Sequence, residues 1–203
     1  LFLPPCRESC VHLFYDIAKL IEGIKEGFGP VSLNILTQLN DGNTDFLNKK
    51  KTGQIDGCIF AFTRIKEALR NEFDDREIPY IHLNRKDKSA FVSYDISNEM
   101  EKLVQALFEK YGEKLVPCYI GFDNLNEVNK QRIEGISDAC KKRKIPYTIS
   151  DHFPISKIEE IDLICNSIFR KKYNAILTFN DLIAMAILKR AEMKGISIPH
   201  DIS

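Results

Sequence analysis

The sequence predicts an α/β fold made of two similar subdomains, each with a parallel sheet. Short apolar runs, typical of buried strands, alternate along most of the chain with longer stretches whose apolar residues recur at helical spacing. The same order of strand and helix starts again after Lys114, which predicts subdomains at residues 1–114 and 115–203. Such alternation favours parallel strands with helices on both faces of each sheet.

Eight short apolar runs predict the strands, because each is bounded by charged or turn-forming residues. One pair of runs departs from the alternation, since no helical pattern lies between them and they are separated by Arg85–Ala90. In chain order the predicted strands are Leu1–Leu3, Val31–Thr37, Asp56–Phe62, Tyr80–Leu83, Phe91–Tyr94, Val116–Phe122, Tyr147–Ser150 and Ala175–Phe179.

Helices are predicted where apolar residues recur three and four positions apart. The first such stretch places Leu13, Ile17, Leu20 and Ile24 on one face, and the others repeat the pattern. The predicted helices are Val11–Glu26, Ser97–Tyr111, Glu127–Lys144, Ser156–Arg170 and Asp181–Lys194.

The composition excludes several classes of protein. The chain has 203 residues, 44% of them hydrophobic, which is enough for one large or two small domains. Lys plus Arg and Asp plus Glu both number 29, so the sequence shows no basic excess of the kind that nucleic-acid-binding surfaces carry. No run approaches the roughly 18 apolar residues of a membrane helix, so no membrane partner is expected. The six cysteines lack metal-site spacing and predict reduced thiols in a cytoplasmic protein.

Sequence motifs for catalysis are missing. The patterns G-x-G-x-x-G, G-x-x-x-x-G-K-[ST] and G-x-S-x-G do not occur, and the four histidines show no recognisable spacing to a Ser or Cys nucleophile. The sequence therefore predicts a binding protein rather than an enzyme, with no cofactor and no metal.

Polar residues collect just beyond the predicted strands, where open parallel sheets bind their ligands. Arginine, asparagine and an aromatic ring together suit a polar, polyhydroxylated or heterocyclic small molecule, and a cleft between two lobes is a favourable place for it. Helix capping is the alternative role for the Asp and Asn residues, a surface ion pair for the arginine and a core contact for the ring. The set is Asn84, Arg85, Asp95, Asp123, Asn124, Arg132, Asp151, His152, Phe153, Asn180 and Asp181.

An ordered set of short motifs resembles the effector-binding domain of LacI/GalR-type transcriptional regulators. The usual Asn-Pro-Phe-Phe after the first strand is missing, and Gly112-Glu113-Lys114-Leu115 stands where the family has Gly-His-Arg-Arg. The matching motifs are Ile55-Asp56-Gly57, Ile78-Pro79 with Asn84-Arg85, Val92-x-x-Asp95, Ile120-Gly121, Arg132-x-x-Gly135, Asn180-Asp181-x-x-Ala184 and Gly195-x-x-Ile198-Pro199-x-Asp201-Ile202-Ser203.

The resemblance implies two Rossmann-like subdomains of the periplasmic-binding-protein-like type I fold, with the second one truncated at its C-terminal end. It implies that Arg132 holds the effector, that Asn180 hydrogen-bonds it and that Phe153 stacks on it. The further candidate contacts are Asp95, Asn98, Arg85, Asp181, Phe14 and Tyr15.

The function implied is a cytoplasmic, homodimeric ligand sensor that binds a small polar effector such as a sugar. Effector binding would shift the lobes and act on operator DNA through a headpiece that this sequence lacks. A solute-binding protein of a sugar transporter is the alternative, and an α/β enzyme is the third. The sequence upstream of Leu1 would separate the first two, since a regulator needs a helix-turn-helix there and a transporter component needs a signal peptide.

Overall fold

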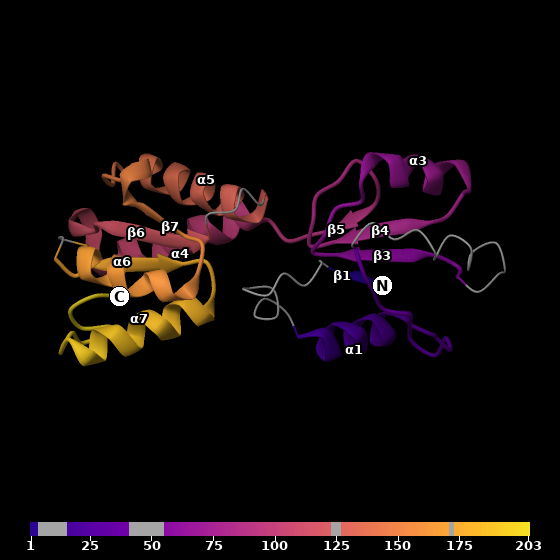
Figure 1. Cartoon of the computed structure of the whole chain (residues 1–203). Helices are drawn as coiled ribbons and strands as arrows, with labels where there is room; N and C mark the ends of the chain where they lie inside the picture. The colour runs from indigo at the N-terminus through magenta and orange to yellow at the C-terminus, as the bar shows by residue number, and fades with distance from the viewer. Residues whose placement is uncertain (4–15, 41–54, 123–126, 171–172) are drawn as a thin grey trace. The chain divides into compact units, whose positions relative to one another are not determined.

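The described strands of the computed structural model pair in parallel, in two sheets that lie in two separate units of the chain (Figure 1). The units are Leu1–Tyr94 and Asp95–Ser203. The predicted α/β class with two parallel sheets is confirmed. The structure describes residues 1–3, 16–40, 55–122, 127–170 and 173–203.

Unit 1 has a five-stranded sheet in the order β2-β1-β3-β4-β5. Figure 1 shows α3 and α1 on opposite sides of this sheet. Its elements are β1 (Phe2–Leu3), α1 (Ile17–Phe28), β2 (Gln38–Leu39), β3 (Cys58–Ala61), α3 (Glu67–Asp75), β4 (Tyr80–Leu83) and β5 (Phe91–Val92).

Aromatic rings form the core of unit 1 on the α3 side. Phe60 of β3 stacks on Phe2 of β1 at 4.7 Å between ring centroids and meets Phe73 of α3 edge-to-face at 5.7 Å. Leu69 and Phe73 are buried four positions apart, one turn of helix, so α3 covers the sheet with one narrow stripe. Helix α3 is not predicted by the sequence pattern, because a two-residue stripe in a charged nine-residue segment gives little periodicity.

Unit 2 has a three-stranded sheet in the order β7-β6-β8, and Figure 1 shows α5 and α7 on its opposite sides. The central strand β6 is buried along its whole length, as expected when helices cover both faces. Its main elements are α4 (Ile96–Tyr111), β6 (Pro117–Phe122), α5 (Glu127–Lys142), β7 (His152–Ile155), α6 (Ile161–Ile168), β8 (Ala175–Thr178) and α7 (Asp181–Met193), with 3₁₀ turns η2 (Gly112–Lys114), η3 (Ile149–Asp151) and η4 (Ile158–Glu160).

Helix α4 packs closely against α5 within unit 2. A Cβ added to Gly135 of α5 would lie 3.0 Å from Ser97 Cα, so the missing side chain lets the two helices approach. Lys142 of α5 also donates to Glu101 of α4 at 2.7 Å. Because α4 packs on α5, the two units divide at Asp95, before the subdomain boundary expected after Lys114.

Two predicted strands are wrong. No strand forms at 31–37, where Val31 is 61% exposed, and β2 follows at Gln38–Leu39. No strand forms at 147–150 either, because the carboxylate of Asp151 accepts hydrogen bonds from the backbone and hydroxyl of Thr148 and closes the turn η3. The strand β7 therefore begins only at His152.

The other predicted elements appear with shifted ends. Asp16 caps α1, since its carboxylate accepts from two backbone N–H groups of the first turn, while residues 11–15 of that predicted helix lie outside the described segments. Within the part of the chain that the structure describes, no helix is both long enough and apolar enough to cross a membrane.

Candidate functional site

The carboxyl ends of β6 and β8 bring Arg132, Phe179 and Asn180 together. Parallel pairing sets Ile120 of β6 beside Thr178 of β8, so the residues that follow both strands emerge at one edge of the sheet. Arg132 reaches this edge from α5, where its Nη1 donates to the carbonyl oxygen of Phe179. Its guanidinium also lies 4.4 Å from the centre of the Phe179 ring, a cation–π distance. Arg132, Phe179 and Asn180 are called the Arg132 cluster below.

Two hydrogen-bond donors of the Arg132 cluster are buried without a partner among the described residues. They are Nε of Arg132 and Nδ2 of Asn180. The side-chain oxygen of Asn180 is occupied, because it accepts from the backbone N–H of Ile183 at 3.1 Å and caps α7. A buried donor without a partner costs about 1–3 kcal/mol, so such groups are rare unless a water, an ion or a ligand satisfies them.

A buried hydrogen-bonded pair of side chains lies next to this edge, at the end of β6. Tyr119 Oη donates to Asn129 Oδ1 at 2.7 Å, and Asn129 Nδ2 donates to the carbonyl of Phe122 at 2.8 Å. Burial raises the pKa of the Tyr119 phenol, which therefore stays protonated and keeps donating. A Cβ on Gly121 would lie 2.5 Å from Asn129 Oδ1, so glycine leaves room for the pair. The roles of Tyr119 and Asn129 were not predicted from the sequence. The signal that could have indicated them is Gly121, because a glycine inside an apolar strand often marks a close approach of other groups.

The acidic candidates of unit 2 lie at the starts of helices. Asp95 accepts from the backbone N–H of Asn98 at 3.2 Å at the start of α4, and Asp181 accepts from that of Leu182 at 3.1 Å at the start of α7. Both carboxylates are exposed. Ser97 touches Gly135, one turn beyond Arg132, so Asp95 and Asn98 begin a helix that runs beside the Arg132 half of α5. The capping alternative is confirmed for Asp95 and Asn180, and a ligand contact by Asp95, Asn98 or Asp181 stays a prediction.

Phe153 does not lie at the carboxyl end of its strand, and that part of the prediction is wrong. It pairs with Ile120 in the middle of β7, because the strand starts at His152 instead of ending at Ser150. Its ring packs edge-to-face on Tyr173 at 5.9 Å, which is the core contact considered as the alternative.

Arg85 lies at the corresponding edge of the sheet in unit 1. Its Nε donates to the carbonyl oxygen of Phe62 at 3.3 Å. Phe62 and Asn84 follow β3 and β4. Both have a left-handed backbone conformation, with φ of 58° and 57°, which residues other than glycine rarely adopt. Backbone strain of this kind gathers at functional sites, and a role of Arg85 in ligand binding stays a prediction. The candidates Phe14, Tyr15, Asp123 and Asn124 lie outside the described residues.

A second polar cluster, which the sequence did not predict, is buried in unit 1 and is called the Asp87 cluster below. Both carboxylate oxygens of Asp87 accept from Arg70, at 2.5 and 2.9 Å. His82 lies 3.1 Å from Ser89 Oγ through Nδ1 and 3.8 Å from Asp87 through Nε2. Serine, histidine and aspartate are the residues of hydrolytic triads, yet this histidine is fully buried and this aspartate is neutralised by an arginine. The arrangement favours a structural role.

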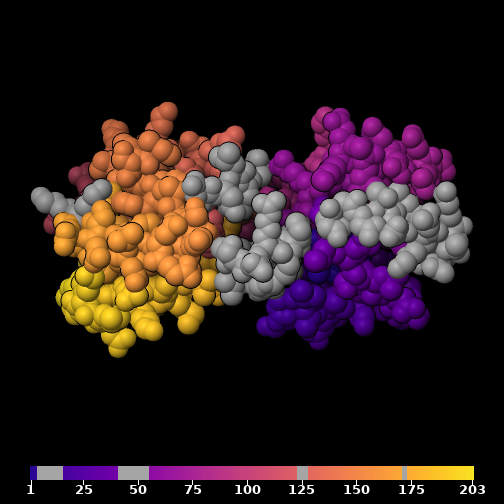
Figure 2. Space-filling view, viewed as in Figure 1, coloured from indigo at the N-terminus to yellow at the C-terminus, as the bar shows by residue number. Residues whose placement is uncertain are grey.

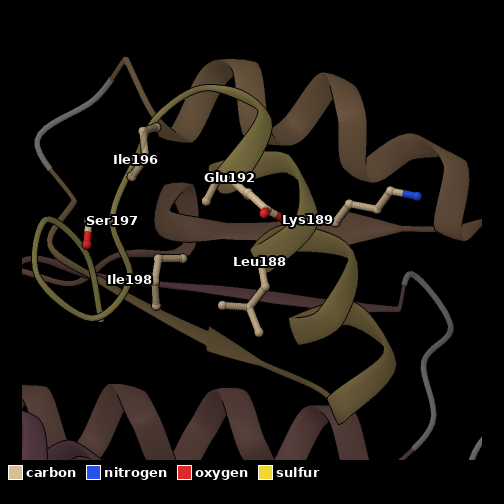
Figure 3. A pocket seen from close by; sticks show the side chains of 7 residues that line it. Leu188, Lys189, Glu192, Ile196, Ser197 and Ile198 are labelled. Carbon is tan, nitrogen blue, oxygen red and sulfur yellow. The ribbon is translucent and has the colours of Figure 1, made fainter.

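Two hollows of the described residues lie away from the Arg132 cluster, and the second of them reaches Ser89 of the Asp87 cluster. One of about 460 Å³ runs along the end of α7, where Figure 3 shows Leu188 and Ile198 at its wall and Lys189 extending away from it. Another of about 410 Å³ lies beside Phe73 and Tyr80. The first lining is mainly aliphatic, the second combines aromatic, aliphatic and acidic side chains, and neither includes a residue of the Arg132 cluster, so we place the candidate site at that cluster.

Sequence comparison finds related regulators, whereas no family model matches. The HTH-type transcriptional regulator DegA of Bacillus subtilis is 28% identical over 206 residues, which cover 94% of this chain and 59% of DegA. Catabolite control protein A of Priestia megaterium is 23% identical, covering 94% of this chain and 60% of that protein. The repressor PurR of Vibrio parahaemolyticus is 24% identical, covering 78% and 49%. The chain thus spans about half to three fifths of the length of these curated relatives.

Solved structures share the fold. A regulatory protein of the LacI family from Chloroflexus aggregans matches with a TM-score of 0.83 at 14% identity, covering all of this chain and 75% of that one. A LacI family transcriptional regulator from Lactobacillus casei with bound glucose matches with a TM-score of 0.69 at 14% identity, covering 92% and 74%. The fold is the periplasmic-binding-protein-like fold of LacI-type regulators, and the resemblance to their effector-binding domain that the sequence predicts is confirmed by these relatives.

Proposed function

We propose that this chain is the ligand-sensing domain of a LacI-type transcriptional regulator and acts by binding rather than by catalysis. Its effector would be a small polar molecule, such as a sugar, bound at the carboxyl edge of the sheet in unit 2. The observation that carries the proposal is the Arg132 cluster, where two buried donors from adjoining residues have no partner among the described residues. A ligand with acceptor oxygens would satisfy both donors.

The relatives support the wider part of the proposal. Proteins named as a transcriptional regulator or repressor match most of this chain, and solved regulators of the same fold hold glucose, sucrose or cellobiose. We therefore propose that effector binding is coupled to operator DNA through a headpiece outside these 203 residues, and that the protein works in the cytoplasm. The coupling requires that the effector bind two conformations of the domain with different affinities.

We also propose a homodimer, in which α7 contributes apolar contacts. Met185, Leu188 and Met193 of this helix are 47–67% exposed, and Figure 2 shows α7 at the surface of unit 2. Neighbouring exposed apolar side chains are typical of surfaces that another protein covers.

Calorimetric titration of the 203-residue chain with a panel of neutral sugars, sugar acids, sugar phosphates and nucleobases tests the binding function. Arg132→Ala should weaken any compound that binds by tenfold or more, because a hydrogen bond from a charged group contributes about 1.5–3 kcal/mol. Lys189→Ala is the matched control, since it removes a positive charge from the exposed surface of α7. An Arg132→Ala variant that binds as tightly as the parent chain would show that the effector lies elsewhere.

A further inference from the structure

The side chain of Tyr119 packs against the part of α5 that carries Arg132. Tyr119 is fully buried in β6, and its hydroxyl donates to Oδ1 of Asn129 on α5 at 2.7 Å. Asn129 and Arg132 stand three residues apart on this helix, so the two side chains project from the same side of it. The hydroxyl of Tyr119 therefore lies against the face of α5 from which Arg132 extends.

The amide of Asn129 fixes the direction of its hydrogen bond with Tyr119. Its Nδ2 donates to the carbonyl oxygen of Phe122 at 2.8 Å, so its Oδ1 is the atom that faces the phenol. An amide oxygen only accepts, which means that the hydroxyl proton of Tyr119 points toward Asn129. The phenol oxygen keeps lone pairs that can accept from a second donor.

Arg132 supplies that second donor. Burial raises the pKa of the Tyr119 phenol, and the charge of Arg132 together with a hydrogen bond from its side chain opposes that rise. A guanidinium carries donors only, which matches an oxygen whose own proton is already in use. With the carbonyl and the ring of Phe179, the phenol gives Arg132 partners from β6 and from the residue that follows β8.

The space for the phenol depends on a glycine in the same strand. A Cβ on Gly121 would lie 2.9 Å from the hydroxyl oxygen of Tyr119 and 2.8 Å from its ring. A larger residue at this position would therefore push the hydroxyl away from α5. The ring of His152 in β7 also stacks on the Tyr119 ring, with 5.5 Å between the centroids, so the phenol has little freedom to move.

We infer that Tyr119, with its hydroxyl oriented by Asn129, is a positioning residue for Arg132. The phenol oxygen accepts from the guanidinium and, with the carbonyl of Phe179, holds it at the carboxyl edge of β6 and β8. The inference rests on the proposed function, because it concerns the arginine placed at the candidate site. It adds a strand residue and a helix residue that do not themselves contact the effector.

Rotation of the Arg132 guanidinium about its Nε–Cζ bond tests the inference, measured by nitrogen-15 NMR on the ligand-free 203-residue chain. Tyr119→Phe keeps the aromatic ring and removes only the oxygen. The rotation should become about tenfold faster or more, because a hydrogen bond from a charged group is lost. The rate at Arg70, which both carboxylate oxygens of Asp87 hold, should not change. Arg132→Lys assigns the signal by removing it.

Tyr173→Phe is the matched control, because it removes a hydroxyl of the same unit that donates to Asp151 at 2.7 Å. It should leave the rotation of Arg132 unchanged. Asn129→Leu is a second variant, which keeps the phenol but removes the acceptor of its proton, and it should speed the rotation about threefold or more. The inference is overturned if Tyr119→Phe leaves the rate unchanged, or if Tyr173→Phe raises it equally, since unit 2 would then only have loosened. An unchanged rate in Asn129→Leu overturns the orienting role of Asn129.

The inference and the proposed function fail separately, because the rotation is measured without a ligand. If Tyr119→Phe frees Arg132 but no compound of the calorimetric panel binds, the positioning role stands and the sensor function fails. If a compound binds and Arg132→Ala weakens it, while Tyr119→Phe changes neither the rotation nor the affinity, the sensor function stands and the positioning role is wrong.

Discussion

Two arginines, Arg70 in unit 1 and Arg132 in unit 2, extend from a helix to a segment that follows a strand, and their partners differ in charge. Arg70 meets Asp87 in a two-pronged ion pair that occupies both carboxylate oxygens, and the carboxylate is 8% exposed. Arg132 has the carbonyl and the ring of Phe179 as partners and also interacts with the hydroxyl of Tyr119, with one nitrogen left open within the described part of the chain. The first arginine is satisfied by the fold itself, and the second is only partly satisfied.

The difference separates a structural arginine from a candidate ligand-binding arginine. A satisfied ion pair binds nothing further, and the hydrogen bond from Arg70 holds the pKa of Asp87 far below its usual range. A guanidinium without a carboxylate keeps the capacity to attract an anion. Burial alone does not distinguish the two residues, because both are partly buried. What distinguishes them is whether the protein supplies the acceptor.

The largest effect predicted from the comparison is on folding. Arg70→Ala leaves the buried carboxylate of Asp87 without its cation and should lower the free energy of unfolding by roughly 3 kcal/mol. Arg132→Ala removes one hydrogen bond and one cation–π contact but also an unsatisfied donor, so the loss should be about 1–2 kcal/mol, smaller than that of Arg70→Ala. Urea unfolding followed by circular dichroism measures both differences.

The control for Arg70 lies just past the end of the same helix. Arg76, the residue that follows α3, is paired with Glu72 at 3.4 Å on the surface, so Arg76→Ala should change the unfolding free energy by less than about 1 kcal/mol. If Arg132→Ala destabilised the chain as much as Arg70→Ala, Arg132 would be a structural residue and the contrast between the clusters would disappear.

The second prediction is that acid destabilises unit 1 through the Asp87 cluster. Burial lowers the pKa of His82 below its ordinary 6.5, so the unfolded chain takes up a proton first and stability falls as the pH drops below about 6.5. Asp87, with its pKa also lowered, adds a second loss as the pH falls below its ordinary 3.8, where the unfolded chain again binds the proton more readily.

Unfolding free energies measured at steps from neutral pH to about pH 3 should show both losses. Asp87→Asn should be less stable at neutral pH and should flatten the curve on the acidic side of about pH 5, because the titrating carboxylate is gone. An unchanged slope in that variant would assign the acid sensitivity to other carboxylates and weaken the structural role of the cluster.

The sequence predicted the ends of helices and strands well wherever the apolar residues of an element follow a clear period. The strand Tyr80–Leu83 forms with the predicted ends, and α4 and α7 begin or end within one residue of prediction. One of the two wrong strands falls where a local polar contact decided the outcome. The contact between Thr148 and Asp151 closes a turn inside an apolar segment that propensity assigns to a strand, since side chains of this kind compete with the ladder for backbone groups.

The candidate site could be predicted only in part for a related reason. Arg132 and Asn180 follow from the rule that parallel sheets bind ligands beyond their carboxyl ends, so sequence position was enough to name them as candidates. Phe153 was misplaced because the position of a strand end decides which side chains stand at the edge, and β7 begins five residues later than the predicted strand. The pair of Tyr119 and Asn129 depends on contact between a strand and the next helix, which spacing in one sequence does not reveal.

The smallest predicted effect separates the two roles of Asn180. As the cap of α7, its oxygen holds the N–H of Ile183, so Asn180→Ala should lower the unfolding free energy by about 1 kcal/mol and Asn180→Asp by only a few tenths. As a ligand donor, its nitrogen is lost in both variants, so both should lose effector affinity. If only Asn180→Ala weakened the effector, the cap alone would matter, and a donor that the fold leaves open would not by itself mark a ligand contact. If Asn180→Asp kept the stability and lost the affinity, the oxygen of Asn180 would stabilise the fold and its nitrogen would bind the effector. One side chain would then combine the two roles that Arg70 and Arg132 fill separately.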